Sequence, residues 1–97
     1  MRIRYSPRAT EDLAAIRQYL IERSPTGSNN VLAAIYAAIE FVRRNPHAAE
    51  TTTIPGVRAK VVRHYQFVVF YRSAEGDVIE IAHIRHTSRQ PWTGEDC

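Results

Sequence analysis

Cysteine is nearly absent from this chain of 97 residues, because Cys97 is the only one. A lone cysteine forms no disulfide within the chain and no cysteine-based metal site, which fits a reducing compartment. No segment approaches the roughly 18 apolar residues that span a bilayer, and residues 1–7 lack the apolar core of a signal peptide. We therefore expect a soluble cytoplasmic protein with no membrane partner.

Lysine is equally scarce. Of the thirteen basic side chains, Lys60 is the only lysine and all others are arginine. With ten acidic side chains the formal net charge is +3. Arginine presents a planar fork that suits two-point contact with carboxylates and phosphates, although genome base composition also favours arginine codons. Glycine-rich phosphate loops, nucleophile elbows and paired-carboxylate motifs are missing too, so no common nucleotide-binding or hydrolase motif indicates a function.

What is present is the composition of an ordinary folded domain. The chain is 44% hydrophobic and 24% charged, with four glycines and five prolines. This argues against disorder and low-complexity sequence. The length suits one domain, and no repeat or linker divides it. We predict a single domain over residues 1–97, with a polar tail over about 91–97.

The first half of the chain predicts a strand and two helices. Residues 2–5 alternate basic and apolar side chains, and Ser6-Pro7 is a strong helix start. The first helix should end near Arg23. Ser24-Pro25 repeats the start signal, but a weak first turn leaves Ser28 as the alternative beginning of the second helix. Asn45-Pro46 ends it. The apolar stripes of the two helices predict an antiparallel αα-hairpin: Ala9, Leu13, Ile16 and Leu20, then Leu32, Ile35, Ile39 and Val42.

The second half predicts three strands. Residues 47–55 read as an irregular polar connection. Next come an alternating segment over 57–61, a central strand over 67–71, a turn over 73–77 and a strand over 78–85. In the first segment Val57, Ala59 and Val61 alternate with Arg58 and Lys60. In the last, we expect Ile79, Ile81 and His83 on one face and Val78, Ala82 and Ile84 on the other.

The predicted fold class is therefore α+β, a two-layer β-α-α-β-β-β domain. An N-terminal strand precedes an antiparallel αα-hairpin, and the hairpin packs on one face of an antiparallel sheet.

Charge is distributed unevenly along the strands. Between Thr51 and Ala74 there are four cations and no acid, and the segment 82–94 has two arginines, two histidines and no acid. We therefore expect a basic surface containing aromatic residues. It suits RNA or DNA through phosphate contact and base stacking, or an acidic peptide, and a solvated sheet face is the simplest alternative.

The four histidines do not predict a metal site. His83 and His86 are three residues apart, but no cysteine or clustered carboxylate completes a ligand set. His86 with Arg63, Arg85 and Arg89 has the chemistry of an acid–base catalyst and phosphate clamp. The alternative, that His86 anchors the end of its strand by hydrogen bonds, is favoured.

An ordered set of segments resembles the RelE/ParE family of type II toxins. These are residues 4–9 (RYSPRA), Ser24-Pro25, Asn45-Pro46, residues 55–58 (PGVR), residues 65–71 and above all residues 84–92 (IRHTSRQPW). The resemblance covers about residues 2–92 and is most specific at His-x-x-Arg after the last strand. It implies the same β-α-α-β-β-β fold, an antitoxin partner, and toxicity when that partner is lost.

The resemblance implies two alternative activities. RelE-like toxins cleave mRNA in the ribosome with several lysines and arginines and a late tyrosine or histidine. ParE-like toxins lack that set and are associated with inhibition of DNA gyrase. Here Lys60 is the only lysine, no tyrosine follows Tyr71, and Trp92 stands in place of a catalytic tyrosine. Both branches commonly have an arginine at the position of Arg63, whereas His86 and Arg89 match the ParE-like pattern. We favour a ParE-like gyrase inhibitor that is not an enzyme. The alternative is an mRNA endonuclease that uses Arg63, His86 and Arg89, and a third reading is an inactive toxin that only forms a complex.

These hypotheses assign candidate residues to two surfaces. For the antitoxin we expect an acid-rich amphipathic segment that wraps the hairpin and the sheet, with contacts at Arg58, Arg63, Phe67, Phe70, Tyr71 and Arg72. Some of these aromatics must face the core. For the target we expect Arg85, His86, Arg89 and Trp92. No cofactor or metal is expected, and DNA is contacted only through the antitoxin complex. The residues leave a homodimer and a toxin–antitoxin heterotetramer open.

Overall fold

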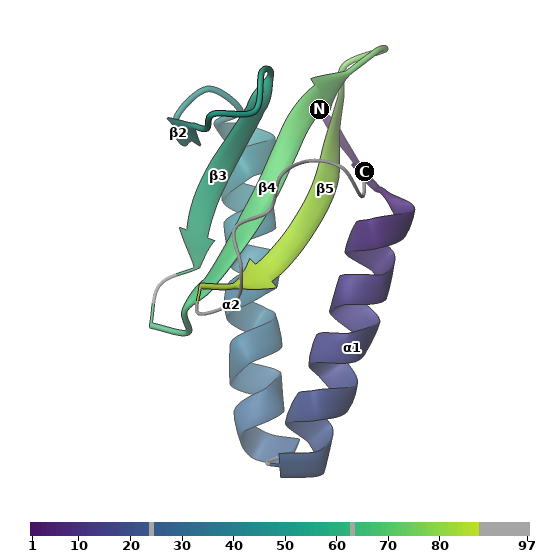
Figure 1. Cartoon of the computed structure of the whole chain (residues 1–97), viewed down its shortest axis with the longest axis vertical. Coiled ribbons are helices and arrows are strands. Elements are labelled where there is room, and N and C mark those ends of the chain that lie inside the picture. Colours follow the sequence, from purple (N-terminus) through teal and green to yellow (C-terminus); the bar gives the residue numbers. More distant parts are fainter. Residues whose placement is uncertain (24, 63, 88–97) are drawn as a thin grey trace.

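A computed structural model describes residues 1–23, 25–62 and 64–87 of the chain. It confirms the α+β class: two helices lie behind one sheet whose strands run in the order β1-β5-β4-β3-β2 (Figure 1). No helix among these residues is long and apolar enough to cross a membrane. The elements are β1 (Arg2–Tyr5), α1 (Pro7–Arg23), α2 (Pro25–Arg44), β2 (Glu50–Thr51), β3 (Val57–Val62), β4 (Phe67–Ala74) and β5 (Val78–His86).

The beginning of α1 also joins two strands. Ser6 is 3% exposed, and its Oγ accepts a hydrogen bond of 3.0 Å from the N–H of Ala9. This is the expected N-cap. The same hydroxyl donates to the carbonyl of Ala82 at 2.8 Å, and the Ser6 N–H donates to the carbonyl of Ile81. The cap therefore continues the pairing of β1 with β5 for one residue beyond the strand.

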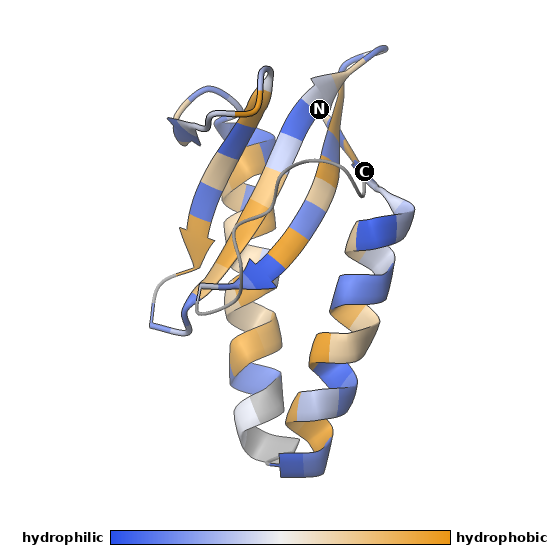
Figure 2. Cartoon of the chain, viewed as in Figure 1, coloured by the Kyte–Doolittle hydropathy of each residue, from blue (hydrophilic) through white to orange (hydrophobic). Residues whose placement is uncertain are grey.

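Both helices end where the sequence predicts. The first ends at Arg23, and the second ends at Arg44, directly before Asn45-Pro46. The second begins at Pro25, so the earlier of the two predicted starts is correct. The helices run antiparallel (Figure 1), and their hydrophobic positions lie mainly toward each other and the sheet (Figure 2).

The sheet contains one strand more than predicted. Glu50 and Thr51 form β2, which pairs antiparallel with Ala59 and Arg58 of β3. The expectation that residues 47–55 are wholly irregular was therefore wrong. A two-residue polar strand has no periodicity of its own, and here it exists because the neighbouring β3 supplies hydrogen-bond partners. At the opposite edge, β1 pairs parallel with β5.

The expected faces of β5 were also wrong, because the pairing with β4 shifts. Phe70 pairs with His83 and Tyr71 pairs with Ile81, so Ala82 is an extra residue in β5. Such a bulge reverses the faces of all following side chains. Ile84 thereby joins the main core between helices and sheet. His83 instead stacks on Phe70 on the opposite, outer face, with ring centroids 5.9 Å apart.

In β3 the alternating apolar residues that begin at Val57 face outward, and the basic residues between them face the helices. Val57 belongs with Phe70 to a second apolar cluster on the outer face. Val62 belongs to the main core, so Arg58 and Lys60 lie on the same side as the helices. Arg58 donates from Nη1 to the carbonyl of Ala49 at 2.7 Å, and the Lys60 ammonium lies 4.5 Å from the ring centroid of Phe41.

Candidate functional site

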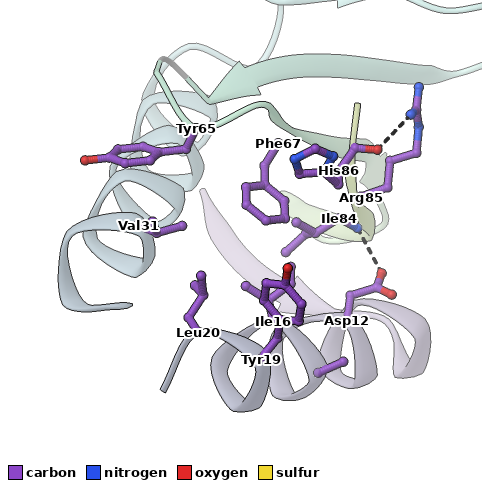
Figure 3. Close-up of a pocket in the computed structure, with 11 residues that line it drawn as sticks. Asp12, Ile16, Tyr19, Leu20, Val31, Tyr65, Phe67, Ile84, Arg85 and His86 are labelled. Carbon is purple, nitrogen blue, oxygen red and sulfur yellow. Dashed lines mark hydrogen bonds between the residues drawn. The ribbon is translucent and has the colours of Figure 1, made fainter. Parts of the chain in front are cut away.

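A groove lies between the helical hairpin and the ends of β4 and β5 (Figure 3). Its volume is about 620 Å³. Apolar side chains line most of it, with aromatic and charged groups among them. The lining residues are Asp12, Ala15, Ile16, Tyr19, Leu20, Val31, Tyr65, Phe67, Ile84, Arg85 and His86.

One face of α1 forms a wall of the groove. Asp12, Ile16 and Leu20 are four residues apart, so they recur on the same side of the helix. Ile16 and Leu20 were expected to be buried, but only the earlier members of their stripe, Ala9 and Leu13, are fully enclosed. The later positions therefore leave apolar surface available in the groove.

Asp12 fixes this wall to the edge of β5. Its Oδ2 accepts the N–H of Ile84 at 2.9 Å and lies 2.6 Å from Nδ1 of His83, and its Oδ1 accepts Nε of Arg8 at 3.2 Å. Burial alone would raise the pKa of Asp12. The hydrogen bonds from His83 and Ile84, with the attraction of His83 and Arg8, outweigh burial and lower that pKa. Asp12 is thus an ionised structural anchor.

Arg85 and His86, two of the predicted target-binding residues, lie together at the groove. The His86 ring meets Phe67 edge to face, with centroids 5.2 Å apart and an interplanar angle of 89°. Nη1 of Arg85 donates to the carbonyl of His86 at 3.2 Å, and its guanidinium lies 5.5 Å from the Phe70 ring centroid, so this side chain points away from the groove toward the outer face (Figure 3). The other predicted target residues, Arg89 and Trp92, lie outside the described residues, as does Arg63.

The structure divides the residues predicted for the antitoxin between both faces of the sheet. Arg58, Phe67 and Tyr71 lie on the helix side, whereas Phe70 and Arg72 lie on the outer face. These residues therefore do not form one continuous surface, since neighbouring residues of a strand point to opposite faces. The expectation that some aromatics face the core is confirmed.

Tyr71 in particular is not an exposed anchor. It is 1% exposed, and its hydroxyl donates to the carbonyl of Pro46 at 3.0 Å. Burial raises the pKa of its hydroxyl despite the charge of Arg58 and a backbone hydrogen bond with Ala49. Tyr71 is a core residue that ties β4 to the end of α2.

Arg72 is occupied by an ion pair on the outer face. Its Nη2 and Nε lie 2.6 and 2.8 Å from Oε1 of Glu80, whose Oε2 accepts Nη2 of Arg4 at 3.0 Å. Burial would raise the pKa of Glu80, but the two arginines outweigh it and lower that pKa. The three side chains form a row across β1, β5 and β4.

Sequence reasoning missed part of the groove. In the sequence Asp12 is only one of two adjacent acids near the beginning of the first helix, and nothing there indicates its contact with β5. Tyr19 gave no signal, because it lies beside the apolar stripe. Among the described residues no three His, Cys, Asp or Glu side chains cluster as metal ligands. The groove offers apolar area, tyrosine hydroxyls, an arginine and a histidine, which are typical of a protein-binding surface.

The fold is a small two-layer α+β domain with a groove between its helices and one end of its sheet. Comparison with protein families identifies it more closely. The family described as "ParE toxin of type II toxin-antitoxin system, parDE" matches residues 3–91. The chain therefore belongs to the ParE toxin family of type II toxin–antitoxin systems, which confirms the resemblance noted in the sequence.

Two solved structures are similar in fold. The chromosomal ParDE toxin–antitoxin system from P. aeruginosa contains a chain with a TM-score of 0.77 and 22% identity, and the match covers 91% of this chain and 97% of that one. The YoeB/ParE toxin from Agrobacterium tumefaciens has a TM-score of 0.62 and 15% identity, covering 89% and 98%. A comparison with curated protein sequences found no match.

Proposed function

We propose that this protein is a growth-inhibiting toxin that acts in the cytoplasm by binding DNA gyrase, and that a cognate antitoxin neutralises it. The observation that carries the proposal is the placement of Arg85 and His86 beside the apolar groove, in a chain of the ParE toxin family. Such a toxin inhibits by occupying a protein surface, so it needs contact area and anchoring side chains and no proton transfer. Arginine and aromatic residues in partly buried positions are the usual anchors.

The direct test is a supercoiling assay with purified gyrase and the purified chain. We expect inhibition at micromolar concentrations of the chain. Arg85→Ala should weaken it at least tenfold, because its guanidinium supplies a positive charge at the end of β5, where we expect the target to bind. Arg44→Ala is the matched control: Arg44 is exposed at the end of α2, pairs only with Glu40 among the described residues, and should leave inhibition unchanged. Thermal unfolding of each variant shows whether the fold is retained.

Other outcomes would replace the proposal. Supercoiling that is unaffected at micromolar concentration contradicts gyrase inhibition. Codon-positioned breaks in mRNA on expression would then support the endonuclease reading, with His86→Ala lowering cleavage steeply. Unchanged growth on expression of well-folded protein would support the inactive, complex-forming reading.

Neutralisation by an antitoxin is tested by co-expression. The gene next to this one should encode a short acid-rich protein, and its co-expression should restore growth. An adjacent product that neither binds the chain nor restores growth would contradict this part of the proposal.

A further inference from the structure

At the β2 edge of the sheet, only the first half of β3 has backbone hydrogen-bond partners. The N–H of Val57 donates to the carbonyl of Ile54, and its carbonyl accepts the N–H of Thr52, both at 3.1 Å. Since successive residues of a strand direct their backbone groups to alternate edges, Ala59 and Val61 face the same edge as Val57. Glu50 of β2 pairs with Ala59, and no strand pairs with Val61 at this edge in the described parts of the chain. Figure 1 shows β2 beside the beginning of β3.

A second groove runs beside this open edge. It has a volume of about 300 Å³, and residues of α2, β3 and the following turn line it. Val61 is 57% exposed and Phe41 is 39% exposed, so apolar area is available on both sides. The groove therefore suits a segment that pairs with Val61 and places side chains against α2. Its lining is Ala34, Ala37, Ala38, Phe41, Lys60, Val61, His64 and Tyr65.

The charge at this edge selects the kind of segment. The strands β3 and β4 contain Arg58, Lys60 and Arg72 and no carboxylate. Arg72 is paired with Glu80, and Arg58 is held by the Ala49 carbonyl. Within the described residues, Lys60 forms no salt bridge with a carboxylate, and its ammonium lies over the face of the Phe41 ring. An incoming acidic side chain would supply the missing partner.

The same lysine disfavours a second copy of this chain. Antiparallel pairing of two β3 edges about Val61 would make the two Lys60 side chains diagonal neighbours, and like charges at such positions are unfavourable. Lysine on an edge strand is a common protection against self-pairing. It does not exclude a strand of opposite charge.

We propose that an extended segment of the antitoxin, with acidic and apolar residues in alternation, adds to the free edge of β3 as a sixth strand. Its backbone pairs with Val61, its carboxylates lie on the helix side where they meet Lys60 beside Phe41, and its apolar side chains lie on the outer face beside the exposed Val61 side chain. The proposal rests on the proposed function only for the identity of the partner. Backbone pairing would supply affinity and Lys60 would supply selectivity for acidic segments.

A synthetic seven-residue peptide of alternating valine and glutamate, blocked at both ends, tests this edge with the full chain. We expect amide chemical-shift changes centred on Val61 and slower exchange of its amide proton. A peptide with lysine in place of glutamate should bind at least fivefold more weakly. Lys60→Glu should reverse that preference, so that the lysine peptide binds better, whereas Arg44→Glu should not change it.

Three results would overturn the proposal. Equal binding of both peptides removes the role of Lys60, and shift changes confined to residues outside β3 remove the site. A concentration-dependent dimer that Val61→Lys abolishes would show that the edge belongs to a second copy. None of these results depends on gyrase or on toxicity, so failure here and failure of the supercoiling assay are distinguishable.

Discussion

The two sides of the sheet end differently. At one side, β1 covers β5 from Val78 to Ile81, and side chains then take over: the Ser6 hydroxyl donates to the Ala82 carbonyl and Asp12 accepts the Ile84 N–H. At the other side, β2 covers two residues of β3 and nothing in the described chain continues to Val61. The first edge is completed by the protein itself, and we infer that the second is completed by a partner.

Removing the Asp12 carboxylate should have the largest effect on the closed edge. Asp12→Ala leaves the Ile84 N–H and His83 without their acceptor in a mostly buried place, so we expect about 3 kcal/mol of destabilisation. Denaturant unfolding measures it. Glu11→Ala is the control, because Glu11 is exposed on the same turn of α1 and should change stability by about 0.5 kcal/mol or less. Equal effects of the two substitutions would show that Asp12 does not hold the edge.

The Ser6 cap should matter somewhat less. Ser6→Ala removes the acceptor for Ala9 and the donor to Ala82 and creates only a small space, so we expect a loss of about 2 kcal/mol. Thr10→Ala serves as the comparison, since among the described residues the Thr10 hydroxyl bonds only the Ser6 carbonyl and is partly exposed. Thermal unfolding of both variants gives the ranking. A Ser6→Ala variant as stable as the parent would contradict the double role of this hydroxyl.

Lowering the pH should reduce the stability that the Asp12 carboxylate contributes at the closed edge. The pKa of Asp12 is lower in the folded chain than its ordinary value of 3.8, so protons bind the unfolded chain more readily. The stabilisation is present above the ordinary value and is lost as pH falls through the lowered value. Asp12→Asn should therefore show a weaker loss of stability below about pH 4 than the parent. Parallel pH profiles of the two proteins would rule out this contribution.

A substitution at the open edge should have the smallest effect. Val61 is 57% exposed and makes no edge pairing among the described residues, so Val61→Thr should change stability by about 0.5 kcal/mol or less. Val62→Thr, one residue further in the same strand, is the matched comparison because Val62 is 2% exposed. We expect it to cost about 2 kcal/mol, because a hydroxyl enters the core. A large loss from Val61→Thr would mean that the edge is already occupied.

The sequence predicted the fold class and the helix bounds because their signals are local. Ser6-Pro7, Asn45-Pro46 and the apolar stripes act within a few residues. The faces of the strands were less predictable. One extra residue at Ala82 placed His83 and Ile84 each on the face opposite to the one expected. No feature of residues 78–85 marks that bulge. Both faces of β3 carry apolar side chains, so its alternation did not decide which side met the helices.

The candidate site was predictable only in part for the same reason. Arg85 and His86 were identified from the pattern at the end of the last strand, and the groove contains both. The residues predicted to contact the antitoxin are close together in the sequence. In a strand, however, successive side chains point to opposite faces, so closeness in sequence does not place them on one surface. The open edge at Val61 depends on where β2 stops, and this is a property of the folded sheet.

Amide hydrogen exchange of the isolated chain compares the two edges most directly. The N–H groups of Ile84 and Val61 lie at opposite edges, one bonded to Asp12 and the other without a strand partner in the described structure. We expect the Ile84 amide to exchange at least a hundredfold more slowly than the Val61 amide, and Asp12→Ala to reduce that difference. Equal protection of the two amides in the parent protein would contradict the distinction between a closed and an open edge.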